Sequence, residues 1–88
     1  MLTNEQREQI ANNVNALLEA VDGPLVHVVY DGIDCYLAAF ESQGFQAHLC
    51  RADDIEECDT LEVDEAMFIQ YVLAVLAQVF VPAMLKGV

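Results

Sequence analysis

The run AMFIQYVLAVLAQVFVPAML, residues 66–85, decides the fold, because these twenty consecutive residues carry no charge. A run of this length is also long enough to cross a bilayer as a helix. Two features weigh against a membrane span. Gln70 and Gln78 would lack hydrogen-bond partners in hydrocarbon, and Pro82 should kink or end the helix. The run therefore predicts the central helix of a soluble domain, with a tail-anchored span as the weaker alternative.

This helix has one broad apolar side and one side of small residues and amides. The apolar side comprises Phe68, Val72, Val75, Leu76, Val79 and Ala83, with Ile69, Leu73 and Phe80 beside it. The amide side predicts a close approach to another helix, either within the chain or in a second copy, and the intrachain contact is favoured. The candidate oligomer contact of a homodimer comprises Gln70, Ala74, Ala77 and Gln78.

The chain has 88 residues, which predicts a single compact domain covering residues 1–88. A core of this size is near the lower limit for independent stability, so help from a partner or a second copy is expected. The charge is unusual, because 15 acidic residues face only 3 basic ones and the net charge is −12. Such a surface repels nucleic acid and anionic lipid, and it favours a partner with a basic surface.

The N-terminus and the cysteines both predict a cytoplasmic protein. Residues 1–7 have neither the basic start nor the apolar stretch of a signal peptide. Cys35, Cys50 and Cys58 are odd in number and have no close-paired spacing, which argues against a disulfide framework and agrees with a reducing compartment.

The first half of the chain predicts one helix followed by a small sheet. Thr3 and Gln6 fit a capping box at a helix start, and Asp22-Gly23-Pro24 is typical of a helix end. The helix has an apolar stripe formed by Ile10, Val14, Leu17, Leu18 and Val21. Residues 25–30 predict a strand that is apolar on both faces and hence covered or central, and Asp31-Gly32 is a strong hairpin turn signal.

Residues 33–43 fit either a helix or a strand, and residues 45–51 predict a further strand. A lone parallel pair would make a very small sheet, so a three-stranded antiparallel meander is favoured over a crossover helix. The predicted fold class is α+β: an N-terminal helix, a small two- or three-stranded sheet that is antiparallel, an acidic connecting segment and a long apolar C-terminal helix.

The acidic segment covers residues 53–65 and holds eight carboxylates with no cation. Ile55, Cys58 and Leu61 recur every third residue, which predicts a short helix or 3₁₀ turn. Thr60 is the predicted cap of the C-terminal helix, with Glu62, Asp64 and Glu65 at its positive end.

No motif predicts catalysis, a cofactor or a metal. The acidic segment lacks both the spacing and the glycine of a calcium loop. His27, Cys35, His48, Cys50 and Cys58 are the candidate zinc ligands, but without knuckle spacing they are better explained as small buried hydrophobes and strand residues. No spacing selects a cysteine–histidine nucleophile pair, and the glycines form no phosphate loop. The chain is therefore expected to be no enzyme.

Two functional hypotheses remain. In the first, the carboxylates imitate nucleic-acid phosphates and occupy the basic groove of a nucleic-acid-binding protein. The predicted contact residues are Asp53, Asp54, Glu56, Glu57, Asp59, Glu62, Asp64 and Glu65. In its short length, acidity and lack of catalytic motifs, the chain is similar in character to antirestriction and anti-CRISPR inhibitors of phages and plasmids. In the second, the acids only solubilise a structural or regulatory subunit that binds a partner or a second copy through its apolar C-terminal helix.

Overall fold

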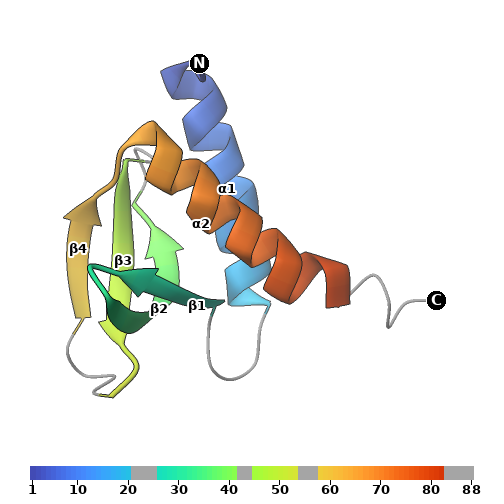
Figure 1. Ribbon diagram of the computed structural model, residues 1–88. Helices are drawn as coiled ribbons and strands as arrows, with labels where there is room; N and C mark the ends of the chain where they lie inside the picture. The colour runs from blue at the N-terminus through green and yellow to red at the C-terminus, as the bar shows by residue number, and fades with distance from the viewer. Residues whose placement is uncertain (21–25, 42–44, 54–57, 83–88) are drawn as a thin grey trace.

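The computed structural model describes residues 1–20, 26–41, 45–53 and 58–82, and its fold is α+β (Figure 1). Four antiparallel strands form a sheet in the order β1-β2-β3-β4. The strands are β1 (Val26–Tyr30), β2 (Ile33–Phe40), β3 (Gln46–Arg51) and β4 (Cys58–Glu62). Helices α1 (Asn4–Glu19) and α2 (Glu65–Val75) pack on one face of this sheet, and α2 continues as the π-helical segment η1 (Leu76–Phe80).

Helix α1 begins at the predicted capping box. The Thr3 hydroxyl accepts the Gln6 N–H at 3.1 Å, and the Gln6 side chain accepts the Thr3 N–H at 2.9 Å. The helix buries Ala11, Val14 and Leu18 against the sheet. The predicted stripe is therefore confirmed at its centre, although Val21 lies outside the described residues.

The turn between β1 and β2 is the predicted hairpin turn. Asp31 and Gly32 have φ values of 52° and 75°, the left-handed conformation that a two-residue type I′ turn requires at both positions. This turn sends the chain back antiparallel, so residues 33–40 form a strand and not a helix. A bulge between Leu37 and Ala39 adds one residue. Because of it, Leu37 and Phe40 both face the core, which explains the helix-like spacing of the apolar residues.

The acidic segment does not form the predicted short helix or 3₁₀ turn at residues 58–62, and Ile55 lies outside the described residues. Its second part is the edge strand β4, in which Leu61 points toward the core, followed by buried Val63. Thr60 lies in this strand and does not cap α2. The N-cap is Asp64, whose carboxylate accepts the Met67 N–H at 2.8 Å. The sheet thus has four strands and not two or three, since strand pairing with β3 overrides the local three-residue pattern.

The core lies between the two helices and one face of the sheet. It comprises Ala11, Val14, Leu18, Val26, Val28, Cys35, Leu37, Phe40, Ala47, Leu49, Val63, Phe68, Tyr71 and Val75. The expectation that the first strand is covered on both faces is wrong, because β1 is an edge strand and Val29 is 59% exposed. Among the described residues, no helix combines the length and apolar character needed to cross a membrane.

Candidate functional site

The face of the sheet that the helices leave open carries most of the polar and reactive strand side chains. Strand alternation places Val28, Leu37 and Leu49 toward the helices. The residues on the other face lie in a row across all four strands, because the register pairs His27 with Tyr36, Tyr36 with Cys50, and Cys50 with Cys58.

At one end of this row, the rings of His27 and Tyr36 meet edge to face, with centroids 5.6 Å apart. The imidazole Nε2 of His27 also lies 3.6 Å from an Asp34 carboxylate oxygen. At the other end, a disulfide joins Cys50 to Cys58 across β3 and β4. The Cα atoms of this pair are 4.1 Å apart, close to the separation of directly opposed residues between ladder hydrogen bonds.

This disulfide contradicts the expectation that the cysteine spacing argues against disulfides, and Cys50 and Cys58 are not the small buried hydrophobes that were expected, since Cys50 is half-buried and Cys58 is exposed. Spacing along the chain is uninformative here, because strand pairing and not a short loop motif brings the two sulfur atoms together. Cys35 is the odd cysteine, buried on the helix-covered face, where desolvation raises the pKa of its thiol. The cysteines therefore no longer indicate a reducing compartment, and a cytoplasmic location stays a prediction.

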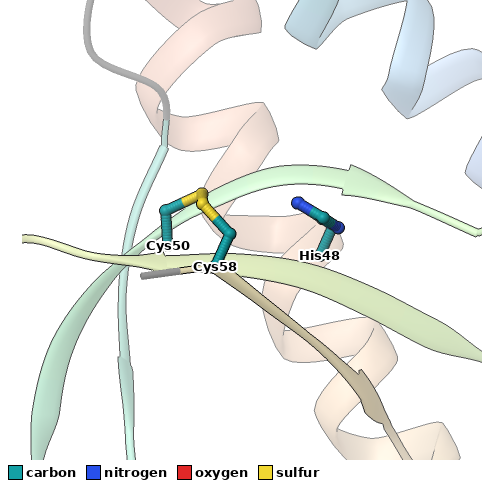
Figure 2. A group of neighbouring side chains, drawn as sticks. All are labelled: His48, Cys50 and Cys58. Carbon is teal, nitrogen blue, oxygen red and sulfur yellow. A yellow bond between two sulfur atoms is a disulfide. The ribbon is translucent and has the colours of Figure 1, made fainter. Parts of the chain in front are cut away.

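His48 lies next to the disulfide on the same face, as Figure 2 shows. It stands two residues before Cys50 on β3 and is paired with Thr60 of β4, whose hydroxyl oxygen lies 3.2 Å from the imidazole Nδ1. One donor atom from each of His48, Cys50 and Cys58 lies within 4.8 Å of the other two. Of the five candidate zinc ligands, the fold therefore brings three together and separates His27 and Cys35 from them.

The proposed acidic contact residues do not form one described row. Asp54, Glu56 and Glu57 lie outside the described residues. Asp53 is exposed, and both its oxygens accept hydrogen bonds from the Arg51 guanidinium, at 2.9 and 2.8 Å. These bonds lower the pKa of the Asp53 carboxyl. Asp59 and Glu62 are exposed on β4 but on opposite faces, because they stand three positions apart and strand side chains alternate between the two faces.

The last two acids of the set have contacts within the chain. Asp64 caps α2, as described above, and Glu65 accepts the backbone N–H of Leu2 at 2.5 Å. The second contact ties the N-terminus of the chain to the start of α2. The predicted placement of these two carboxylates at the positive end of the C-terminal helix is confirmed.

The strip of alanines and glutamines on α2 and η1 faces β1. The Gln78 side-chain carbonyl accepts the His27 N–H at 3.0 Å, and its amide donates to the His27 carbonyl at 2.9 Å. Gln70 and Ala74 line a small hollow against His27, Val28 and Val29. Part of the candidate oligomer contact is therefore occupied by the chain's own first strand, whereas Ala77 is exposed.

In contrast, three large apolar side chains of α2 and η1 are more exposed than predicted, namely Ile69, Leu73 and Phe80. These side chains were expected beside the buried face of the helix, but they are 43%, 58% and 42% exposed. With Val81, which is 46% exposed, they form an uncharged stripe that we call the apolar stripe. The available signal was the composition of residues 66–82, because an uncharged run with large apolar side chains on more than one side has more apolar surface than one sheet can cover.

Comparison of the chain with protein-family models, with curated proteins and with solved structures found no match in any of the three.

Proposed function

We propose that this protein is a non-catalytic interaction module that binds a partner protein through the apolar stripe. The main support for this proposal is that Ile69, Leu73, Phe80 and Val81 are exposed on the helical segment whose opposite side fills the core. Large apolar side chains that remain in contact with water on one side of a helix are typical of a docking surface. Burying such a side chain fully is worth about 1.5–3 kcal/mol, so half-exposed groups still offer substantial binding energy.

The spacing of the stripe supports helix-in-groove binding. Ile69 and Leu73 stand four residues apart on α2, and Phe80 and Val81 follow at the end of the π-helical segment η1 and just beyond it. Residues four apart lie on one side of an α-helix, so Ile69 and Leu73 offer adjacent apolar side chains to a groove, and Phe80 and Val81 add further exposed apolar side chains to the same helical segment.

The acidic surface supports selectivity for the partner. Residues 66–82 carry no charge, whereas the whole chain has a net charge of −12. A groove with a basic rim would be attracted, and an acidic protein would be repelled. The same repulsion opposes a second copy of this chain as the occupant.

The test compares partner capture by the wild type with capture by Leu73→Gln and Phe80→Gln. Val29→Gln is the matched control, because Val29 is as exposed but lies on the open sheet face. We expect a partner, quantified by mass spectrometry, to be retained by the wild type and by Val29→Gln and lost with both stripe variants. Equal retention by all four proteins, with unchanged circular dichroism, would refute the role of the stripe.

A phosphate-mimic inhibitor is the second candidate. It is supported by Asp59 and Glu62, which are exposed on the edge strand β4 and form no ion pair within the described residues. Asp53, Asp64 and Glu65 support it less, since each is engaged within the chain.

Salt and a nucleic-acid competitor separate the two candidates. A mimic complex should dissociate between roughly 0.1 and 0.5 M salt, where exposed charges are screened, and double-stranded DNA should displace it. It should also weaken in Asp59→Asn/Glu62→Gln. A complex made by the apolar stripe should survive the salt and the DNA and should lose affinity only with the stripe variants.

A further inference from the structure

The open face of the sheet holds a cluster of metal-binding side chains that the proposed interaction surface does not use. His48 and Cys50 stand two residues apart on β3 and so point to the same side, and Cys58 is directly opposite Cys50 on β4 (Figure 2). One imidazole nitrogen and two sulfur atoms lie within 4.8 Å of one another. His48 and Cys50 are half-buried and Cys58 is exposed, so reagents and ions can reach the cluster.

We propose that reduction of the Cys50–Cys58 disulfide creates a zinc site from the two thiolates and the His48 imidazole. The disulfide is then the oxidised, metal-free form of a redox-controlled metal site. Two thiolates and one imidazole are a donor set that zinc prefers, and calcium and magnesium require oxygen ligands instead.

The geometry fits zinc once the sulfur–sulfur bond is broken. Tetrahedral zinc with Zn–S bonds of about 2.3 Å holds its ligand atoms about 3.5–3.8 Å apart. The three donor atoms already lie within 4.8 Å of one another, so side-chain rotation is enough and the strands keep their register. Three protein ligands leave the fourth position for water. Thr60 beside His48 can hold the imidazole in its orientation through the 3.2 Å contact.

The redox step is a two-electron exchange with a dithiol reductant. One thiolate of the reductant attacks a sulfur of the disulfide and forms a mixed disulfide, which the second thiolate of the reductant then releases. The products are two cysteine thiols and the oxidised reductant. Zinc binding displaces the two thiol protons. A low-molecular-weight disulfide reverses the exchange by accepting two electrons, which restores the Cys50–Cys58 bond and expels the ion.

Cobalt(II) titration of the full chain tests the proposal, because cobalt replaces zinc and its spectrum reports thiolate ligands. The protein is reduced with a phosphine under nitrogen, since a phosphine adds no competing thiol. We expect one equivalent of cobalt to give a thiolate charge-transfer band with tetrahedral d–d bands, and zinc to remove both. The disulfide form should give neither band, and calcium should not compete.

Variants assign the ligands. Cys50→Ser and Cys58→Ser should each abolish the charge-transfer band, and His48→Gln should weaken binding by at least about tenfold, the least that even an outer-shell change costs a metal site. Cys35→Ala is the matched control, because Cys35 lies on the other face, and it should bind as the wild type does. Zinc should also protect Cys50 and Cys58 of the wild-type chain from alkylation. The proposal would be overturned if the reduced wild type gave no thiolate band, or if the band persisted without Cys50 and Cys58. It would also be overturned if zinc failed to protect these two cysteines from alkylation.

Discussion

At the scale of single residues, two side-chain amides replace missing strand partners. The Gln78 side chain forms hydrogen bonds with both the backbone N–H and the backbone carbonyl of His27 at the outer edge of β1. Asn15 does the same for Phe40, accepting its N–H at 2.8 Å and donating to its carbonyl at 2.9 Å, beyond the point where β1 pairs with β2. A primary amide presents a donor and an acceptor side by side, as a neighbouring peptide would. These contacts attach the two helices to the sheet by polar as well as apolar interactions.

The first prediction concerns Gln78→Ala. Loss of both hydrogen bonds should lower the free energy of unfolding by about 1–2 kcal/mol, since each net bond is worth about 0.5–1.5 kcal/mol. Urea unfolding followed by circular dichroism measures the change. Gln70→Ala, an exposed amide on the same helical segment, should change the value by much less. Equal effects of the two substitutions would contradict the edge-capping role.

A second residue-scale prediction concerns Tyr71. Its hydroxyl is buried without a hydrogen-bond partner among the described residues, and burial, followed by the nearby Tyr30, raises its pKa. The folded state then holds the phenolic proton more tightly than the unfolded state does. This contribution to stability is complete below the unfolded pKa near 10 and is lost as the pH rises through the higher folded pKa.

Tyr71→Phe removes both the ionisation and the unpartnered hydroxyl. The variant should be no less stable at neutral pH, and its free energy of unfolding should fall less steeply above about pH 10. Denaturant titrations at several alkaline pH values measure this difference. Matched slopes in the variant and the wild type would show that another group governs alkaline unfolding.

At the scale of elements, β4 depends on its neighbour more than the other strands do. Its burial is slight, with only Leu61 partly covered, and no strand within the described residues pairs with its outer edge. Five register pairs to β3 and the Cys50–Cys58 disulfide hold it in place. The disulfide joins residues eight apart in sequence, and in the chain-entropy view a loop of this size contributes about 2.5 kcal/mol.

Reduction should therefore lower the free energy of unfolding by roughly 2–3 kcal/mol when metal is excluded by a chelator. Thermal or urea unfolding with and without a phosphine measures the loss. The double variant Cys50→Ser/Cys58→Ser should match the reduced wild type and should not respond to the phosphine. If the phosphine leaves the stability of the wild type unchanged, the disulfide does not stabilise β4 in this way.

At the scale of the whole molecule, the helical run that exposes the apolar stripe is separate in sequence from the charged residues. The net charge of −12 belongs to residues outside the helical run 66–82, which is uncharged and exposes the apolar stripe. Self-repulsion among like charges opposes the compact state, and Glu19 adds an unfavourable charge at the negative end of α1.

Salt should therefore stabilise this protein. The urea midpoint should rise as salt increases from about 0.02 to 0.3 M, because the screening length falls below the spacing of the surface charges. Glu19→Gln should add about 0.3–1 kcal/mol at low salt, and this gain should shrink at high salt. A midpoint that falls with salt would mean that attractive ion pairs such as Arg51–Asp53 outweigh the repulsion.

The amino-acid sequence by itself determined the features that depend on near neighbours in the chain. Thr3 and Gln6 cap α1 across three residues, Asp31-Gly32 sets the hairpin, and the run from residue 66 forms the last helix. Tertiary structure alone decided the identity of β4, the joining of Cys50 to Cys58 beside His48, and which side of α2 meets water. The bond between Gln78 and His27 crosses 51 residues, and no local pattern encodes such a contact. The physical reason is that capping and turn energies act within one or two turns of backbone, whereas strand pairing and burial depend on which distant surfaces meet.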